Sequence, residues 1–428
     1  MNKIAKNASW IIICRVIQAL LNLVVSMITA RYLGPSNFGL ITYAASLVAF
    51  IVPLVQLGIN CILVRELIET PEQGGNIIGT ATLLSTASSM LGILEIWVFT
   101  SVVNRSEHDT ILVCLLYSIS LVFQMTEMIQ FWYQSKLMSK YVSIISLISR
   151  IIVSLYKIFI IISGKSIYWF AIVNSLDYLI VSVLLFAVYF KLGGQKLSFS
   201  IKTACRLLSN GKHFIIAGMM MSIFAHTDKI MLKLMMGDAE SGFYSVAASC
   251  AGMTVFVFTA IIDSFRPVIF ENKKDNPTIY KKNTVRQYSI VIFLALIQSF
   301  VLTILAKPII QILYGNEYLP SVSILRIITW YSAFSYLGSA RYTWFIAEEK
   351  QKYIWITNLI GAVVNVAGNA ILIPLWGGCG AAVASVTTQV LTNFILNFFI
   401  SPIRENGMWM LEAFNPRVLV EMIGIKKK

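Results

Sequence analysis

The sequence is poor in charge. Asp, Glu, Lys and Arg make up 13% of its 428 residues, against about 25% in an average soluble domain. Hydrophobic residues make up 57%, and the mean hydropathy is +0.76. This composition excludes a soluble domain and indicates an integral membrane protein. The apolar runs are long and continuous rather than alternating, so they predict membrane-spanning helices and not a β-barrel.

Motifs for catalysis and cofactor binding are also missing. The sequence contains no Walker loop for nucleotide phosphates, no HExxH and no GxSxG, which excludes an ATP motor within this chain and the hydrolases that these motifs mark. The six cysteines are scattered, with no CxxC or CxxH pair, so we interpret them as small apolar residues. We therefore expect no catalytic residue, no metal and no cofactor.

Twelve apolar segments are each predicted to exceed the roughly 20 residues that cross the hydrocarbon. Their ranges are 8–30, 39–62, 77–103, 110–132, 142–163, 167–190, 213–235, 242–266, 287–306, 322–346, 353–374 and 379–400. The first run is full-length and follows Lys3 and Lys6, so no cleavable signal peptide is expected.

The distribution of basic residues predicts the orientation. A formal charge of +14 would suggest nucleic acid in a soluble protein, but here the charge follows membrane topology and no nucleic-acid partner is expected. Most Lys and Arg residues fall on one side of the predicted bilayer, including the cluster from Lys191 to Lys212 and the terminal Lys426, Lys427 and Lys428. The other side has only Arg31, Arg105, Lys165, Lys233 and Lys307. Both termini are therefore predicted to be cytoplasmic.

An internal repeat divides the chain. The segment 34–46 aligns without a gap onto 237–249, with both glycines and an Ala-Ala-Ser in common, at an offset of 203 residues. Six spans separate the copies, so the two halves run in the same direction, as in transporters built from internal repeats. The predicted domains are an N-lobe at 1–190, a basic cytoplasmic linker at 191–212, a C-lobe at 213–400 and a cytoplasmic tail at 401–428.

Polar residues at helical spacing of three and four form stripes inside the spans. Span one carries Arg15, Gln18, Asn22, Ser26 and Thr29. Span two carries Thr42, Ser46, Gln56 and Asn60, and the repeat offset carries this stripe to Ser245, Ser249, Thr259 and Asp263, followed by Arg266. Span seven adds His226 and Lys229 on one face, with Asp228 about 100° away. Span five adds Arg150 and Lys157, and span eleven adds Asn358, Asn365 and Asn369.

Ionisable residues at membrane depth are costly, so each should face a cavity or a partner. For Arg15 and Lys229 we favour a cavity, because they lie further from the ends of their spans than Arg266 does. For Arg150, the alternatives to a role in the cavity are an ion pair or a side chain that reaches the cytoplasmic edge. For Arg266, the alternative is a position at a helix end. The alternative for His226 is a packed polar residue, and for the Asn and Ser stripes it is hydrogen bonding between helices.

Motifs in this order resemble the polysaccharide exporters of the multidrug/oligosaccharidyl-lipid/polysaccharide (MOP) superfamily, in particular the O-antigen flippase (Wzx-like) family. The similar segments cover nearly the whole chain and are Ala30 to Pro35 with Phe38-Gly39, Thr227-Asp228-Lys229, Gly242-Phe243-Tyr244, Phe265-Arg266-Pro267, Leu313-Tyr314-Gly315 with Tyr318, Asn365 through Asn369 to Pro374, and Gly380 to Ser385.

The resemblance implies an all-α, MOP/MATE-like membrane protein of two pseudo-symmetric six-helix bundles. It also implies a flippase that moves a polyprenyl-pyrophosphate-linked oligosaccharide, such as an O-antigen unit of lipopolysaccharide, from the cytoplasmic to the periplasmic leaflet of the bacterial inner membrane. Transport by alternating access would draw on an H⁺ or Na⁺ gradient. Other polysaccharide-assembly membrane proteins are further expected partners, beside the lipid bilayer itself.

The candidate site residues fit such a substrate. The pyrophosphate needs cations, which Arg15, Lys229, Arg266 and Arg150 supply. Sugar hydroxyls need amides, which Asn22, Gln56, Asn60 and Asn358 supply. The candidates for ion coupling are Asp228, Asp263 and His226.

Two other functions compete with this one. A multidrug antiporter of the same superfamily would bind organic cations and need an acidic, aromatic cavity, whereas the faces predicted here are net basic. A membrane-embedded polysaccharide polymerase or glycosyltransferase would need sizeable external loops, and the only candidate is the short turn 105–109.

Overall fold

The computed structural model describes residues 3–418, with their side chains except those of residues 3–13, 125, 274 and 275. Every regular element in this range is helical, as predicted. The predicted basic residues Lys426, Lys427 and Lys428 lie outside the described residues, as does the end of the predicted tail. The side chains of Lys3 and Lys6 are likewise outside the description.

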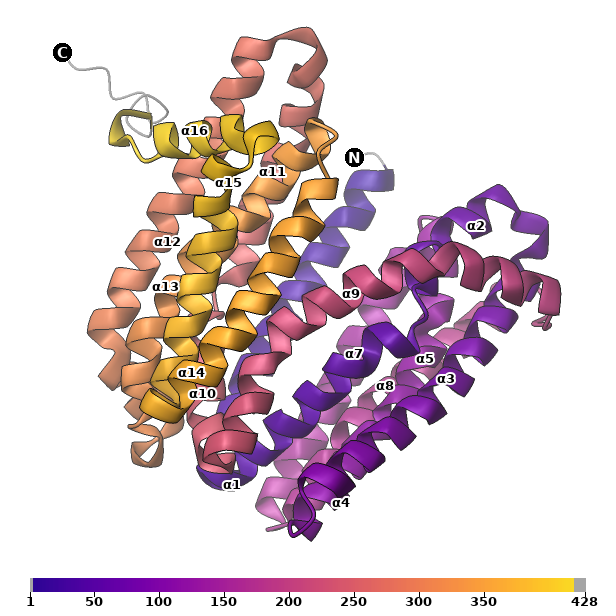
Figure 1. Ribbon diagram of the computed structural model, residues 1–428. Helices are drawn as coiled ribbons and strands as arrows, with labels where there is room; N and C mark the ends of the chain where they lie inside the picture. Colours follow the sequence, from indigo (N-terminus) through magenta and orange to yellow (C-terminus); the bar gives the residue numbers. More distant parts are fainter. Residues whose placement is uncertain (1–2, 419–428) are drawn as a thin grey trace. The chain divides into compact units, whose positions relative to one another are not determined.

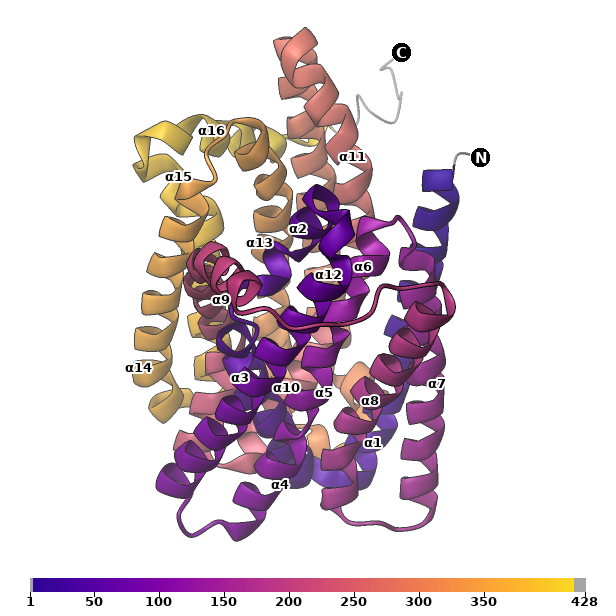
Figure 2. The same ribbon diagram turned by 90° about the vertical axis from the view of Figure 1, so that its right-hand side faces the viewer.

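The chain folds into two compact units, Met1–His226 and Thr227–Lys428. The first contains α1 (Lys3–Val55), η1 (Ile59–Cys61), α2 (Leu63–Glu69), η2 (Pro71–Gln73), α3 (Gly74–Val103), α4 (His108–Ser118), α5 (Ser120–Thr126), η3 (Glu127–Ile129), α6 (Gln130–Ser135), α7 (Ser139–Ile162), α8 (Ile167–Lys191) and most of α9 (Ile201–Met236). The border between the units lies within α9, and the predicted linker 191–212 belongs to the first unit. Figure 2 shows α7 and α8 side by side, joined by a short loop.

The second unit begins with the end of α9. It continues with α10 (Asp238–Ala251), α11 (Val255–Asp275), α12 (Pro277–Tyr314), η4 (Asn316–Tyr318), α13 (Ser321–Ala347), α14 (Lys352–Val390), the π-helix η5 (Leu391–Ile395), α15 (Leu396–Phe399), η6 (Ser401–Ile403) and α16 (Arg404–Ala413). The helices α12, α13 and α14 run side by side, and α16 lies across their ends (Figure 1).

Eight helical segments in the described range are long and apolar enough to cross a membrane, or nine if the bent pair α10 and α11 forms one span. Two of these segments contain a non-helical glycine, Gly34 in α1 and Gly377 in α14. Each of the two covers a pair of the ranges predicted from the sequence. The protein is therefore an all-helical multi-pass membrane protein, and the number twelve stays a prediction.

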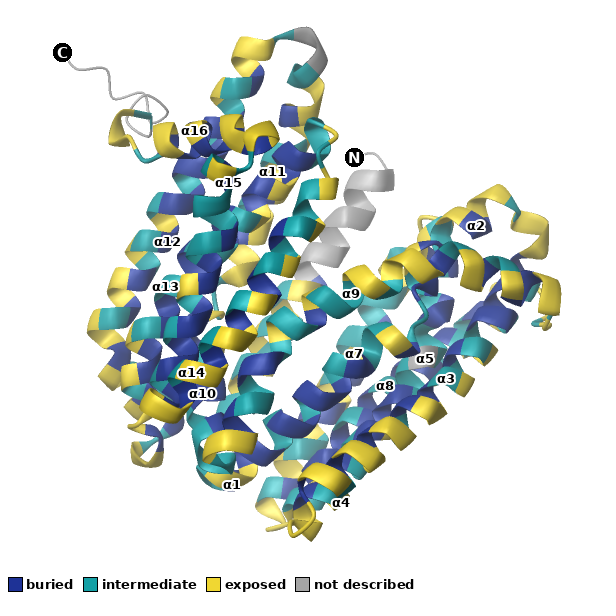
Figure 3. Ribbon diagram, viewed as in Figure 1, coloured by how far each residue is buried: buried dark blue, intermediate teal, exposed yellow. Residues whose placement is uncertain are grey.

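The surface of the helices is apolar, as a bilayer requires. Along α3, for example, Met90, Leu91 and Leu94 are each more than half exposed, and Figure 3 shows this exposed face along the helix. Small polar residues of the same helix, such as Ser85 and Ser89, are instead fully buried. Helix packing through small residues is typical of membrane proteins, where lipid solvates large apolar side chains as well as a protein core does.

The internal repeat has a structural counterpart. Gly34 has φ 72° and ψ 172°, and its repeat partner Gly237 has φ 95° and ψ −179°. Glycine adopts positive φ at no steric cost, so both copies turn the chain at the same point. The polar stripe is also repeated, because Ser46 donates to the carbonyl of Thr42 at 2.7 Å and its counterpart Ser249 donates to that of Ser245 at 2.8 Å. The match predicted from the sequence is thus a match of backbone conformation.

The tail helix α16 packs onto the second unit. Trp409 and Met410 are buried in a core that includes Tyr280 and Trp344, and the rings of Tyr280 and Trp409 lie 5.5 Å apart. Lys281 of α12 pairs with Glu412 at 2.7 Å. The described part of the predicted tail is therefore a structural element of this unit.

All six cysteines are free thiols. Cys14, Cys114 and Cys250 are buried, whereas Cys61 and Cys205 are exposed. The three buried cysteines therefore agree with the interpretation of these residues as small apolar side chains.

Candidate functional site

A buried carboxylate of the second unit is bonded to side chains of α10 and α14. Asp228 is in α9, and only 8% of it is exposed. Its Oδ1 accepts a hydrogen bond from Asn369 Nδ2 at 2.6 Å. Its Oδ2 accepts from the hydroxyl of Tyr244 at 2.5 Å and from that of Ser385. Three donors from three helical segments therefore surround one charge.

Two local features of α14 and α10 position these donors. At Gly377, with φ 55° and ψ −133°, α14 reverses, which brings Asn369 and Ser385 to the same carboxylate. Glu240, in the first turn of α10, accepts a hydrogen bond from the backbone of Gly378 at 2.6 Å and holds this turn. The two arms then pack closely, because a Cβ on Gly380 would lie 2.0 Å from the carbonyl oxygen of Leu372. Only glycine permits this approach.

A fifth residue, Asn365, joins these four side chains. We call the group Asp228, Tyr244, Asn365, Asn369 and Ser385 the Asp228 cluster. Asn365 accepts from Asn369 at 3.2 Å and donates to Ser385 at 3.4 Å. The Oδ1 of Asn369 is buried and accepts no hydrogen bond from a described residue. Within the described range Asp228 forms no salt bridge.

These properties suit a small cation. The carboxylate accepts three hydrogen bonds, and a buried charge is costly unless other charges offset it. Carboxylate, amide and hydroxyl oxygens are the ligands that hard cations prefer. The Asp228 cluster therefore has the chemistry to bind and release a proton or a metal ion such as Na⁺.

A row of polar residues continues from Ser385 along the same helical segment. Gln389, Asn393 and Asn397 follow at intervals of four residues. Arg341 of α13, 3% exposed, donates from Nη1 to Asn397 Oδ1 at 3.2 Å and from Nη2 to Asn393 Oδ1 at 3.2 Å. Its Nη1 also donates to the carbonyl of Thr392 at 2.8 Å, inside the π-helix η5. The buried guanidinium of Arg341 thus bonds only to neutral groups among these contacts, and it stabilises the π-helix η5.

The predicted cavity cations differ in their surroundings. Arg15 is exposed on α1, on the same face as Asn22, and forms no salt bridge with a described residue. Lys229 is half-buried and likewise forms no salt bridge within the described range. Arg15 therefore keeps its charge available for a ligand, whereas the charge of Lys229 also interacts with the neighbouring carboxylate of Asp228.

The other two predicted cations are paired. Arg150 of α7 lies 3.0 Å from the carboxylate of the buried Asp177 in α8, and Ser149 donates to the same carboxylate at 2.6 Å. The ion-pair alternative described above therefore applies to Arg150. Arg266 pairs with Asp263 one helical turn away, at 3.2 Å, and both side chains are half-exposed.

The predicted polar residues are distributed over both units. Asn60 donates to Gln56 at 2.9 Å, so these two are held together in the first unit. His226 and Asn358 are partly buried, and Thr259 is exposed and bonds to its own helix. The structure brings together Asp228 with Asn369 and Asn365. It does not bring Asp263 into that cluster.

Sequence analysis missed the convergence of Tyr244, Asn369 and Ser385 on Asp228. A signal was present, because these residues lie in three of the segments that carry the family resemblance, and Asp228 lies in a fourth. The polar stripe of span eleven already contained Asn365 and Asn369. What was lacking was any indication of which helices are neighbours.

A model of the family described as polysaccharide biosynthesis protein matches residues 4–273. An uncharacterized membrane protein of Methanocaldococcus jannaschii is 24% identical over 260 residues, which cover 56% of this chain and 50% of that protein. The alignment therefore spans half the length of this curated relative.

Two solved structures share the fold. The lipid II flippase MurJ in an inward closed conformation superposes with a TM-score of 0.69 at 16% identity, covering 97% of this chain and 93% of that one. An inward-facing multidrug resistance MATE family transporter of the MOP superfamily gives a TM-score of 0.68 at 14% identity, covering 93% and 96%. At these identities the likeness is one of fold, and it extends over nearly the whole chain.

Proposed function

The chain belongs to the polysaccharide biosynthesis protein family, and from this premise we propose that it is a flippase for a polyprenyl-pyrophosphate-linked oligosaccharide. The substrate would be an O-antigen unit or a similar repeat unit of a surface polysaccharide. It would move from the cytoplasmic to the periplasmic leaflet by alternating access. The match of the family model to residues 4–273 carries the proposal, and the fold shared with a lipid II flippase supports it.

Family and fold together are those of a MOP-fold transporter and not of an enzyme. A multidrug cation antiporter remains the second candidate, because the MATE transporter shares the fold almost as closely. The charges favour the flippase. Arg15 and Lys229 form no salt bridge with a described carboxylate, and their charge suits an anionic pyrophosphate and would repel an organic cation.

The Asp228 cluster is proposed as the coupling site. A transporter that uses an ion gradient must bind the ion in one state and release it in another, which a buried carboxylate with adjustable hydroxyl partners permits. Asp263 is a weaker candidate, because it is half-exposed and already paired with Arg266.

Deletion of the gene tests the substrate class. We expect one lipid-linked oligosaccharide to accumulate on the cytoplasmic leaflet, and the wild-type gene to reverse this. The measurement is extraction of polyprenyl-linked glycans and their identification by mass spectrometry. Normal glycan export with increased sensitivity to cationic drugs would instead favour the antiporter.

Orientation is part of the proposal. Twelve segments would span a bacterial inner membrane with both termini in the cytoplasm. The glycine turns inside α1 and α14 would each join two of these segments, and the sequence predicts that the basic loops lie on one side. A reporter active only in the periplasm should work when fused after Arg105 or Glu317. It should be silent after Lys202 or Lys281. The reverse pattern would refute this orientation.

A further inference from the structure

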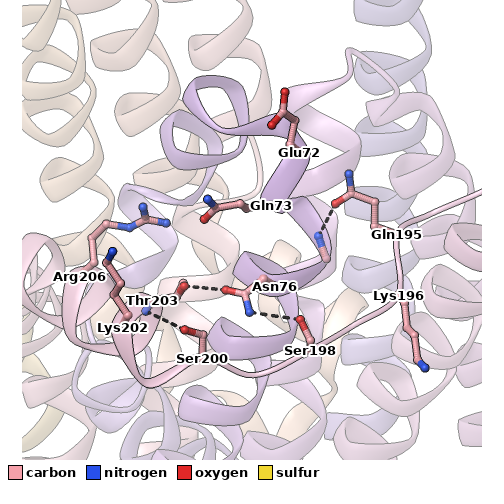
Figure 4. A pocket seen from close by; sticks show the side chains of 11 residues that line it. Glu72, Gln73, Asn76, Gln195, Lys196, Ser198, Ser200, Lys202, Thr203 and Arg206 are labelled. Carbon is pink, nitrogen blue, oxygen red and sulfur yellow. Dashed lines mark hydrogen bonds between the residues drawn. The ribbon is translucent and has the colours of Figure 1, made fainter.

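A polar pocket in the first unit is not used by the proposed transport mechanism. It has a volume of about 710 Å³. It lies where the segment 195–200 and the first turns of α9 meet the start of α3 (Figure 4). The residues that line it are Glu72, Gln73, Gly75, Asn76, Gln195, Lys196, Ser198, Ser200, Lys202, Thr203 and Arg206. We call it the linker pocket.

Hydrogen bonds fix the segment that forms the floor of the linker pocket. Gln195 accepts from the backbone of Gly75 at 2.7 Å and donates to the carbonyl of Pro71 at 3.0 Å. Asn76 donates to Ser198 at 3.2 Å and accepts from Thr203 at 2.6 Å. These bonds tie the segment to α3 on one side and to α9 on the other.

Glycines allow the close approach of the two backbones. A Cβ on Gly75 would lie 2.4 Å from the carbonyl oxygen of Lys196, and one on Gly79 would lie 2.4 Å from that of Ser198. No other residue fits without a shift of the backbone. The shape of the pocket is therefore determined by the fold.

The charged residues that line the linker pocket are three basic ones, Lys196, Lys202 and Arg206, and one acidic one, Glu72. Lys202 and Arg206, one helical turn apart on α9, lie next to each other in Figure 4, whereas Lys196 points away from them. Glu66 lies 3.2 Å from Nε of Arg206, but it also accepts from Asn210 at 3.1 Å. The Nη2 of Arg206 is buried and donates to no described residue. A donor of this kind, beside a lysine, needs an anionic acceptor.

Two helix starts add to the positive potential. The chain enters α3 at Gly74 and α9 at Ile201, both beside the pocket. The helix dipole favours an anion at such ends, while the N–H groups of Gly74 and Gly75 at the start of α3 already donate to Pro71 and Gln195. Ser200 and Thr203 supply hydroxyl groups at the second of them.

Exposed apolar side chains accompany the charges. Phe199 is 49% exposed and Ile201 is 73% exposed, directly beside the lining residues Ser198, Ser200 and Lys202. Basic residues interleaved with exposed apolar ones are the pattern of a segment at the membrane interface. A ligand that combines a phosphate with acyl chains satisfies both features.

We infer that the linker pocket binds the phosphate of an anionic phospholipid headgroup, with Lys202 and Arg206 as its cationic ligands. The apolar side chains of Phe199 and Ile201 contact the acyl chains of the same lipid. This site is separate from the Asp228 cluster and does not depend on the transported substrate. Its occupancy would make the stability of the first unit depend on the lipid composition of the leaflet.

The test uses the purified full-length protein in vesicles of phosphatidylcholine, with and without phosphatidylglycerol. Phosphatidylglycerol should raise the apparent melting temperature of the wild type, because a ligand of the native state stabilises it. Binding should be about five-fold weaker in Lys202→Gln, and weaker again when Arg206→Gln is added. Lys191→Gln, which removes an exposed lysine outside the pocket, is the matched control and should bind as the wild type does.

Three outcomes would overturn the inference. Equal weakening in Lys191→Gln and Lys202→Gln would mean that the lipid responds only to net surface charge. Unchanged binding in Lys202→Gln would remove that residue as a ligand. Inorganic phosphate that protects the wild type fully, with no further gain from phosphatidylglycerol, would assign the pocket to free phosphate. Lys202→Gln alone keeps the Arg206–Glu66 pair, so it remains informative if the double variant does not fold.

Discussion

Asp228→Asn is expected to abolish ion-coupled transport while the protein remains in the membrane at near-normal abundance. The change removes the charge but keeps the size and one carbonyl oxygen. Asn369 can still donate to that oxygen, and the hydroxyls of Tyr244 and Ser385 can rotate to accept from the new amide. The initial rate of transport should fall at least about ten-fold, equivalent to ~1.4 kcal/mol in the barrier.

The contrast with Asp228→Ala separates coupling from folding. Alanine leaves three buried donors without an acceptor, at a cost of roughly 1–3 kcal/mol each, so this variant should also lose abundance. Rates in proteoliposomes should be measured under an imposed Na⁺ gradient and, separately, under an imposed pH gradient. The gradient that drives the wild type and fails to drive Asp228→Asn identifies the ion.

Asp263→Asn is the control for this experiment. Asp263 is half-exposed, and its loss breaks an exposed pair with Arg266 that contributes little to stability. We expect near-normal coupling in this variant. Normal coupling in Asp228→Asn together with its loss in Asp263→Asn would show that the ion site has been assigned to the wrong carboxylate.

Arg15→Ala and Lys229→Ala are each expected to reduce glycan export sharply. Each residue lies in the first helix of its predicted lobe, and neither forms a salt bridge with a described carboxylate. Loss of either cation should therefore weaken binding of the pyrophosphate, and Lys229→Ala also removes a charge that interacts with the buried Asp228. Membrane abundance, measured by immunoblotting, should stay near that of the wild type.

Conservative variants refine this prediction. Arg15→Lys should retain partial export if positive charge is sufficient, and should fail if two parallel hydrogen bonds to phosphate are required. Arg105→Ala removes an exposed arginine from the loop between α3 and α4 and should leave export unchanged. If Arg15→Ala lowers abundance and an exchange of charge with an acidic residue such as Glu95 restores it, the role of Arg15 is structural.

Much of the fold was predictable because it follows from local composition. Long apolar runs specify the helices, and the repeat points to Gly34 and Gly237, which both have positive φ. Hydrogen bonds within a helix, such as those of Ser46 and Ser249, follow from spacing alone.

The surroundings of Asp228 were less predictable. The residue itself stood out as a carboxylate in an apolar segment, but Asn369 and Ser385 are 141 and 157 positions away in the chain. They meet it only because α14 reverses at Gly377, which the sequence indicates as a turn without giving its direction. Arg150 illustrates the same limit, since its partner Asp177 lies on a different helix.

The π-helix η5 is a further feature that helical spacing in the sequence could not predict. Spacing rules assume about 100° of rotation for each residue, and a π-turn changes the phase of every residue that follows. Asn397 reaches Arg341 from beyond this turn. A stripe drawn from Ser385 at constant spacing cannot anticipate that change of phase, and Arg341 was accordingly not among the predicted site residues.

The distribution of free thiols has a practical consequence. Because Cys14, Cys114 and Cys250 are buried, maleimide reagents should react mainly with the exposed Cys61 and Cys205 of the native chain. Cys205 directly precedes Arg206, and Cys61 lines a second hollow of about 410 Å³ in the same unit. A fluorophore on either thiol would report on the surface around the linker pocket without engineered cysteines. The protein thus carries native attachment points for spectroscopy where its lipid contacts are proposed.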